Sequence, residues 1–213
     1  GYSPSWYFSS GYVEPRELGC RCDVCPLGRF RRSTGTWRPV PPEVWPDTQP
    51  TLSILAEAPG PSEVRLQRPQ IGRGWDEVLR PALENAGVRR SDVVISNALL
   101  CQPVLNDIRP LLAEVKRHND KVGAANPPGS AGELIPDPYD CCRPGVIAVV
   151  RRAPNVLVLG SSAWRSLTGE RQGVGSIRGA FMDRYMIPET GVVWRPPGGI
   201  REGQEFPGLL HIR

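Results

Sequence analysis

The chain has 213 residues, of which 39% are hydrophobic and 23% charged, and its formal net charge is +4. This length suits one domain with a well-covered core and room for one sizeable loop or arm. No apolar run approaches the roughly 20 residues that span a bilayer, and the first residues lack the basic-then-apolar order of a signal peptide. We therefore expect a soluble, intracellular protein without a membrane partner. Because the chain begins with Gly1, we also expect an expression remnant or a piece of a longer protein.

Two features of the composition bear on partners. Lys116 and Lys121 are the only lysines among the 26 basic side chains. Arginine binds phosphate bidentately, so this bias favours a nucleic-acid partner, although a GC-rich coding sequence explains much of it. Six cysteines in a chain without a secretory signal favour a metal or cluster site over a disulfide framework.

The N-terminal region combines an irregular arm with a cysteine motif. Residues 1–19 show no clear period, and we expect an arm that lies across the domain or leads in from another one. Cys22 and Cys25 then form a C-x-x-C pair, whose thiolates can face one metal ion or one cluster. A basic cluster with interleaved aromatic residues follows. It could contact a phosphate backbone, although a solvated loop is the commoner explanation. Its arginines are Arg29, Arg31 and Arg32.

The stretch at residues 52–60 predicts a buried parallel strand that ends in an acid and a tight turn. Its apolar run is short, and a helix that began there would not continue through Pro59 and Gly60. Ligands of open α/β sheets bind beyond the carboxyl ends of the strands, so Glu57 is placed to meet one. A strand-capping acid that faces solvent is the alternative.

The remaining patterns predict alternating strands and helices around one inserted excursion. Hydrophobic spacing and turn residues predict the following elements: an extended connector at 39–50; a loop at 61–73; a helix at 75–87 with Pro81 in a kink or near the first turn; a strand at 92–100; a helix at 108–118 within an insertion at 104–140; a helix at 145–152; a strand at 155–160; a helix at 161–169 capped by Ser161 or Ser162; a hairpin or paired segment formed by 180–187 and 192–195; and a further strand at 209–213. This order predicts an α/β fold in three layers, α/β/α, with a central, mostly parallel four-stranded sheet.

The motifs across residues 20–180 together resemble the uracil-DNA glycosylase superfamily, most closely its iron-sulfur (family 4) branch. That branch has an early C-x-x-C-Pro-Leu, a Gly-Glu-Ala-Pro-Gly segment with an acid shortly after, a strand ending in Asn before Cys-x-Pro, a second Cys-x-Pro at a helix start, and Leu-Gly-x-x-Ala with a later Arg-Gly. The matching segments here are residues 22–27, 56–60 with Glu63, Asn97 with 101–103, 142–146, and 159–163 with 178–179.

The resemblance implies a glycosylase-like domain over residues 20–213 and roles for individual residues. A [4Fe-4S] cluster would be held by Cys22, Cys25, Cys101 and Cys142, with Cys20 and Cys141 as bystanders. Composition alone leaves a structural zinc site open, because four thiolates serve either group.

The resemblance also assigns the catalytic and binding residues. Glu57 would position or activate the attacking water and offset positive charge on the sugar, and Asn97 would read the edge of a flipped base. The backbone N–H groups of Ala58 and Gly60 would hold a base oxygen. DNA contacts are expected from Arg29, Arg31, Arg32, Arg73 and Arg178.

Three departures from the family bear on these roles. Gln70 replaces the aromatic platform on which uracil stacks, a contact worth about 1–3 kcal/mol per base. The family's later His-Pro-Ser motif is absent, because the chain ends at Arg213 near where that motif would begin. The insertion at 104–140 is long, and a covalent-trapping branch of the superfamily carries a nucleophilic histidine there, which makes His118 an alternative nucleophile.

The sequence therefore supports competing hypotheses of function. The leading one is a DNA-binding, iron-sulfur domain that flips and excises uracil, within a larger replication or repair protein. The alternative is a catalytically inactive module that keeps the fold to hold DNA or a polymerase partner. A zinc-bearing nucleotide hydrolase is a third class, but the chain has no phosphate-cradling glycine motif or paired metal carboxylates.

Overall fold

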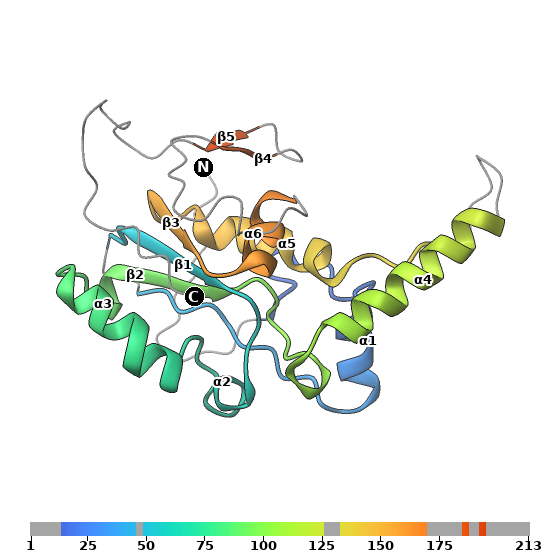
Figure 1. The fold of residues 1–213 in the computed structure, drawn as a ribbon, viewed down its shortest axis with the longest axis horizontal. Coiled ribbons are helices and arrows are strands. Elements are labelled where there is room, and N and C mark those ends of the chain that lie inside the picture. The colour runs from blue at the N-terminus through green and yellow to red at the C-terminus, as the bar shows by residue number, and fades with distance from the viewer. Residues whose placement is uncertain (1–13, 46–48, 126–132, 170–184, 188–191, 195–213) are drawn as a thin grey trace.

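The centre of the molecule is a parallel β-sheet. The computed structural model describes residues 14–45, 49–125, 133–169, 185–187 and 192–194. Within these residues the sheet has three strands in the order β2-β1-β3, which are β1 (Leu52–Ala56), β2 (Val93–Asn97) and β3 (Asn155–Val158) (Figure 1). The predicted α/β class with a parallel sheet is confirmed. The fourth strand, expected at 209–213, lies outside the described residues.

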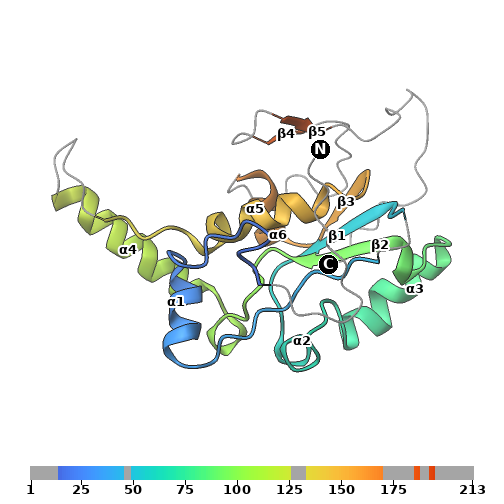
Figure 2. The ribbon, with the colours of Figure 1, turned by 180° about the vertical axis from the view of Figure 1, so that it is seen from behind.

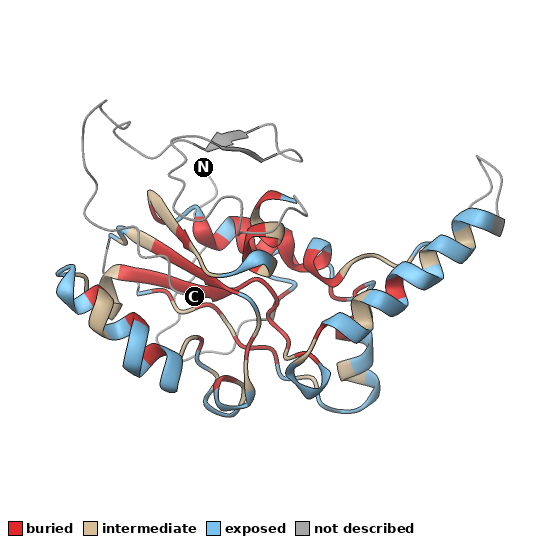
Figure 3. Ribbon diagram, viewed as in Figure 1, coloured by how far each residue is buried: buried red, intermediate tan, exposed pale blue. Residues whose placement is uncertain are grey.

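Helices cover both faces of this sheet and form the three predicted layers (Figures 1 and 2). A π-helix (Trp75–Leu79) and α3 (Arg80–Asn85) pack on one face, and α5 (Pro138–Val150) with α6 (Ser161–Thr168) lies against the other. Because successive strand residues point to opposite faces, both faces need apolar side chains. Accordingly, β1 and β2 are buried along almost all of their length, whereas β3 is mostly half-buried (Figure 3).

The outer edge of β2 is covered by the proline-rich extended segment. The Val40 N–H donates to the Leu100 carbonyl at 2.7 Å, and Glu43 and Ile95 exchange two backbone hydrogen bonds of 2.8 and 3.0 Å. This pairing is antiparallel to β2. The extended conformation predicted for this connector is confirmed over its described residues.

Two of the predictions were wrong: one segment expected to be a loop contains a helix, and one helix starts earlier than expected. The segment at 61–73 was expected to be a loop but contains α2 (Pro61–Leu66), because Pro61 occupies the first helical turn and the Glu63 side chain accepts the Gly60 N–H at 2.7 Å. The helix expected at 145–152 starts seven residues earlier in α5, where the Asp137 carboxylate accepts the Tyr139 N–H at 2.9 Å. Pro144, inside α5, concealed this longer helix in the sequence.

Other helices follow their predictions more closely. Pro81 lies in the first turn of α3, as expected. Gly169 ends α6 with a φ of 78°, as expected, but Gly160 caps its start in place of either serine. The helix expected at 108–118 is longer: α4 (Arg109–Ala125) extends away from the body of the molecule (Figures 1 and 2).

The remaining elements are short. They are α1 (Pro26–Ser33), which had no predicted counterpart, 3₁₀ turns at Arg90–Asp92 and Val104–Asn106, and the antiparallel pair β4 (Tyr185–Ile187) and β5 (Val192–Trp194). That pair confirms the predicted pairing of these two segments over their described residues. Among the helices of the described segments, none combines the length and apolar character needed to cross a membrane.

Candidate functional site

The carboxyl ends of β1 and β2 bring an acid and an amide to the same edge of the sheet. Ala56, the last residue of β1, is paired in register with Asn97, the last residue of β2. Glu57 follows directly, and its carbonyl accepts the Leu99 N–H at 3.0 Å, which continues the pairing past the strand ends. Because parallel strands end at one edge, Glu57 and Asn97 are neighbours there, as the sequence led us to expect.

The Glu57 side chain is exposed and is approached by residues from three helices. The Ser162 hydroxyl, in the first turn of α6, donates to Glu57 Oε1 at 2.9 Å. Tyr139 of α5 lies near both: burial raises the pKa of Tyr139 to about 12, Ser162 lowers it and the Glu57 charge raises it. Arg109, at the start of α4, is bound to Asp107 at 2.7 Å and interacts more weakly with the Glu57 charge.

Asn97 lies beneath the surface in a network centred on Glu63. Asn97 is 1% exposed and Glu63 is 8% exposed. The Glu63 carboxylate accepts three N–H groups, from the Gly60 backbone at 2.7 Å, the Gln70 backbone at 2.6 Å and Asn97 Nδ2 at 3.2 Å. The Gln70 side chain donates from Nε2 to Asn97 Oδ1 at 3.4 Å. Glu63 thus connects three of the residues expected to contact a base.

Gln70 is held in a sparsely populated backbone conformation. Its φ is 49°, in the left-handed region that non-glycine residues seldom adopt. Both of its backbone polar groups are bound by charged side chains, because the N–H donates to Glu63 and the carbonyl accepts from Arg90 Nη1 at 2.8 Å. Arg90 is itself fixed by Glu43 at 2.7 Å and by stacking over Trp75 at 4.0 Å from the ring centre.

The backbone groups expected to hold a base oxygen lie in the turn between β1 and α2. The Gly60 N–H already donates to Glu63. Ala58 is half-buried and packs against the core.

All six cysteines are free and buried, and they belong to one core cluster. They come from three separate segments: the approach to α1 (Cys20, Cys22 and Cys25), the loop after β2 (Cys101) and the first turns of α5 (Cys141 and Cys142). The four cysteines that the resemblance selected therefore lie in the same core cluster. The two remaining thiols lie among them, since the Cys20 thiol donates to the Cys142 carbonyl at 3.6 Å.

The cysteines influence one another's ionisation. Burial raises the pKa of the Cys22 thiol to about 12, with Cys142 and Cys25 adding to the rise. Burial likewise raises the pKa of Cys101, again with Cys142, Cys25 and Cys22 contributing. A hydrogen bond with Cys141 lowers the pKa of Cys25 to about 7. Thiolates packed this closely repel one another, so each favours the protonated form of its neighbours. A bound cationic centre would instead favour the thiolate form.

The cysteines supply the donor type of a group that is bound through sulfur, but the described residues do not form a closed metal site. Four buried thiols from three segments match the all-cysteine ligation of iron-sulfur clusters and of structural zinc. In the part of the chain that the structure describes, no three His, Cys, Asp or Glu side chains converge closely enough to hold a single metal ion.

The arginines expected to bind DNA differ in their surroundings. Arg31 donates to the Gln102 carbonyl at 2.6 Å and to the Pro103 carbonyl at 3.0 Å, which ties α1 to the Cys101 loop. Arg29 donates to a backbone carbonyl at 2.7 Å, and Arg32 lies 4.2 Å from the centre of the Trp37 ring. Arg73 is exposed and forms an ion pair within one helical turn, with Glu77 at 2.8 Å.

Two further expectations fall on the insertion and on the C-terminal region. His118 is exposed on α4, and its Nε2 lies 3.3 Å from the Glu133 carbonyl. Arg178 lies outside the described residues.

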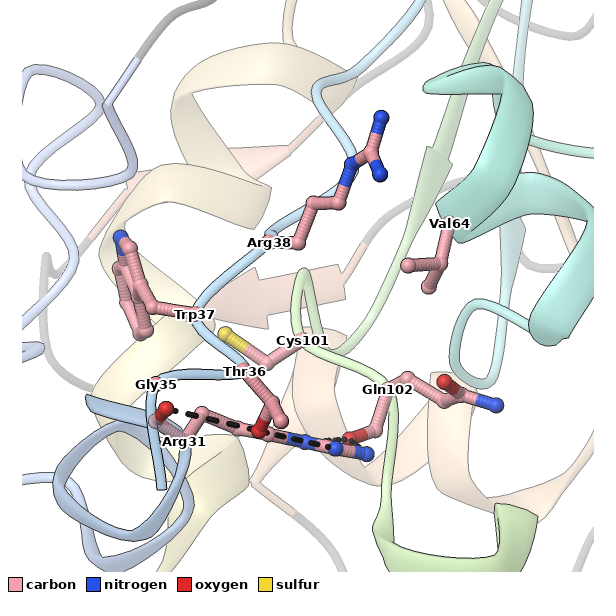
Figure 4. Close-up of a pocket in the computed structure, with 8 residues that line it drawn as sticks. All are labelled: Arg31, Gly35, Thr36, Trp37, Arg38, Val64, Cys101 and Gln102. Carbon is pink, nitrogen blue, oxygen red and sulfur yellow. Dashed lines mark hydrogen bonds between the residues drawn. The ribbon is translucent and has the colours of Figure 1, made fainter. Parts of the chain in front are cut away.

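A cavity of about 330 Å³ borders the cysteine cluster. It opens between the loop after α1, the Cys101 loop and α2, and Arg31 lies along one side of it with hydrogen bonds to Thr36 and Gln102 (Figure 4). Its lining residues are Arg31, Gly35, Thr36, Trp37, Arg38, Val64, Cys101 and Gln102. The cavity is therefore next to the predicted cluster ligand Cys101 and does not include Glu57 or Asn97.

Sequence reasoning missed two residues of the Glu57 edge. Glu63 was noted only as part of a motif, yet it binds the turn, Gln70 and Asn97. Ser162 was considered only as a helix cap, yet its hydroxyl reaches Glu57. The Leu-Gly-Ser-Ser-Ala segment carried the signal for Ser162, because a residue just after a strand end in a parallel sheet lies at the ligand-binding edge.

Fold and site define a three-layer α/β protein. It carries an acid and an amide at the ends of adjacent parallel strands, and its cysteines lie in the buried core. Over 90 residues the chain is 39% identical to the type-4 uracil-DNA glycosylase of Pyrobaculum aerophilum, and the matched segment covers 42% of each protein. The chain thus spans about two fifths of the length of the curated relative that it matches. No family model matches the chain. The similarity confirms the resemblance to the uracil-DNA glycosylase superfamily and its family 4 branch.

Proposed function

We propose that this protein is a uracil-DNA glycosylase-like domain that binds DNA, flips a uracil out of the base stack and hydrolyses its glycosidic bond. The observation that carries the proposal is the register of Ala56 with Asn97, which sets the Glu57 carboxylate and a base-reading amide at one edge of the sheet. The 39% identity to a type-4 uracil-DNA glycosylase supports it.

The geometry of Glu57 suits the activation of water. Its carboxylate is exposed at the strand end, where an incoming substrate reaches it, and the Ser162 hydroxyl leaves the second carboxylate oxygen for a water molecule. The same negative charge lies where it offsets the positive charge that develops on the sugar as the base departs. General-base assistance of this kind contributes about 10²–10⁴-fold in rate.

Asn97 suits recognition of the flipped base. A side-chain amide donates and accepts in one plane, which matches the adjacent N–H and carbonyl of the uracil edge. Because Asn97 is buried and its oxygen accepts from the Gln70 side chain, a base that pairs with this amide would have to displace the Gln70 contact.

Cys22, Cys25, Cys101 and Cys142 are proposed to hold a [4Fe-4S] cluster, with structural zinc as the alternative. Four thiolate donors in one buried core support this assignment. When bound, the group would be structural, joining the N-terminal segment, the loop after β2 and α5. Such cross-linking would fix the Cys101 loop, which follows β2 just after its last residue, Asn97.

The proposed context is a soluble, intracellular protein that acts on DNA, within a larger replication or repair protein. Its partners would be DNA and a polymerase or another replication protein. Among the expected DNA contacts, Arg73 has an exposed side chain and is proposed to meet the phosphate backbone.

An anaerobic glycosylase assay on uracil-containing single-stranded and duplex DNA tests the proposal. Wild-type protein is expected to yield abasic product, and Glu57→Gln is expected to lose at least about 100-fold in rate, because the amide cannot act as a base. Glu84→Gln, the same change at an exposed acid of α3, serves as the control. Wild-type protein that binds DNA but forms no product would refute the enzymatic proposal.

A catalytically inactive binding module is the second candidate, favoured by one observation. Gln70 stands where the related enzymes have a stacking aromatic residue, and its amide occupies the Asn97 oxygen that a base would use. The same assay separates the two functions, because a module would retain DNA binding without product.

A further inference from the structure

Glu63 is a buried acid whose role the proposed reaction does not include. It accepts hydrogen bonds from three segments of the base-binding edge: the turn after β1, the Gln70 backbone and the end of β2. A carboxylate within 2.6–3.2 Å of three N–H groups, with an exposed fraction of 8%, is held in one place.

The contact with Asn97 determines which way the Asn97 amide points. An ionised carboxylate only accepts hydrogen bonds, so the amide atom that faces Glu63 must be the nitrogen. Rotating the amide by half a turn would set its oxygen 3.2 Å from a carboxylate oxygen. In a site that is 1% exposed, two facing acceptors have no water to separate them, and the rotated state is strongly disfavoured.

A fixed amide distinguishes uracil from cytosine. Uracil presents an N–H beside a carbonyl, which pairs with the free Oδ1 lone pair and the second Nδ2 hydrogen of Asn97. Cytosine presents the reverse, a ring nitrogen that accepts beside an amino group that donates, and it would require the rotated amide. We propose that Glu63 is a positioning residue that locks the Asn97 amide in the orientation that accepts uracil and rejects cytosine.

The Gln70 side chain does not provide this lock. Its Nε2–Oδ1 distance of 3.4 Å lies at the long end of hydrogen bonding, so this donor is readily exchanged for the N–H of a base. Gln70 also carries both a donor and an acceptor and could satisfy either orientation of Asn97 by turning its own amide. Glu63, which can only accept, cannot adapt in this way.

The inference rests on the proposed function and is tested by base discrimination. Single-turnover excision of uracil and of cytosine is compared in otherwise identical single-stranded oligonucleotides. Glu63→Gln places an amide of the same shape against Asn97 and admits both orientations. We expect its ratio of uracil to cytosine excision to fall at least about tenfold, because a site built to hydrogen-bond one edge derives its selectivity from fixed groups.

Two variants control the comparison. Glu77→Gln, the same change at an exposed acid of the neighbouring π-helix, is expected to keep the wild-type ratio. Gln70→Ala removes the weak contact but leaves Glu63 in place, and it is expected to keep the ratio as well. A Gln70→Ala protein that loses discrimination would overturn the assignment to Glu63, and this arm remains informative if Glu63→Gln does not fold.

A second readout does not depend on activity. The side-chain amide of Asn97, identified in ¹⁵N NMR spectra by its loss in Asn97→Asp, is expected to give one pair of signals in the wild type and doubled or broadened signals in Glu63→Gln. An Asn97 amide in Glu63→Gln that stays as sharp as in the wild type would refute the lock. Absence of uracil excision by wild-type protein would refute the proposed function and leave this spectroscopic comparison valid.

Discussion

The Ser162 hydroxyl donates a 2.9 Å hydrogen bond to Glu57 Oε1 and so joins the start of α6 to the end of β1. The two residues are 105 positions apart and meet only because β1 and β3 are adjacent parallel strands whose following residues share one edge. Among the described residues, the Glu57 carboxylate therefore has one oxygen that accepts a side-chain hydrogen bond, and the side chain as a whole is exposed.

We predict that Ser162→Ala lowers kcat for uracil excision by about tenfold, or about 1.4 kcal/mol of transition-state stabilisation, with little change in KM. The reason is that a freely turning Glu57 carboxylate spends less time oriented toward the water. Ser162→Thr keeps the hydroxyl and should restore most of the rate. Steady-state kinetics on single-stranded substrate measure both, and equal losses in the two variants would contradict the positioning role.

A matched pair of cysteine variants tests the cofactor. Cys22→Ser is expected to remove the brown colour together with protein-bound iron and sulfide, whereas Cys20→Ser keeps them, because only Cys22 belongs to the proposed ligand set. Anaerobic purification, visible absorption and metal analysis give the result. Colourless wild-type protein that contains zinc would exclude the cluster.

Arg73 and Arg31 should respond differently to the same substitution. Arg73→Gln is expected to weaken DNA binding and to reduce the slope of log affinity against log salt by about one, as loss of one phosphate contact does. Arg31→Gln should leave this slope unchanged and lower the free energy of unfolding by about 1–3 kcal/mol, since its partners are partly buried carbonyls of the Cys101 loop. Fluorescence anisotropy at several salt concentrations and denaturant titration measure the two effects. A reduced salt slope in Arg31→Gln would contradict this distinction.

Glu43 links stability to pH. Burial opposes its ionisation, but the guanidinium groups of Arg68 and Arg90 outweigh this, so the pKa of Glu43 in the folded protein lies below its usual value. A lowered folded-state pKa stabilises the protein above the unfolded-state pKa of about 4.3, and this contribution is lost as pH falls through the folded-state value. Glu43→Gln should thus be less stable than wild type by about 1–3 kcal/mol at pH 7, with the difference narrowing below about pH 4.

Urea denaturation at several pH values provides the measurement. Glu84→Gln, which removes only an exposed ion pair with Arg80, should stay within about 0.5 kcal/mol of wild type at every pH. A pH-independent difference between wild type and Glu43→Gln would show that charge on Glu43 does not contribute.

The sequence predicted the elements whose signal is local. The strands β1, β2 and β3 were found because buried parallel strands are short apolar runs bounded by turn residues. The helix α2 was missed because Pro59, Gly60 and Pro61 together indicate a turn, and the stabilising contact comes from the side chain of Glu63. The start of α5 was missed because Pro144 interrupts its pattern.

The site was predictable in its strand ends and not in its contacts. Glu57 and Asn97 follow recognisable strands, so their shared edge could be inferred. The three-way binding of Glu63 depends on the exact turn at 57–60 and on the left-handed backbone of Gln70, neither of which has a periodic signal. Likewise, the inward-facing contacts of Arg31 depend on how α1 packs against a loop 71 residues later, so composition alone suggested a phosphate contact.

The segment at 40–43, which is hydrogen-bonded along the outer edge of β2, should also protect the protein from self-association. An uncovered β2 would present the N–H and carbonyl groups of an apolar strand, a template for pairing with a second chain. The segment at 40–43 is itself a poor partner for a strand of a second chain, because Pro41 and Pro42 have no backbone N–H to donate. The segment lies shortly after α1 in the chain, so any event that detaches α1 and the cysteines before it would free this edge. Disruption of the buried cysteine cluster should therefore lead to aggregation through the edge of β2 before the rest of the fold is lost.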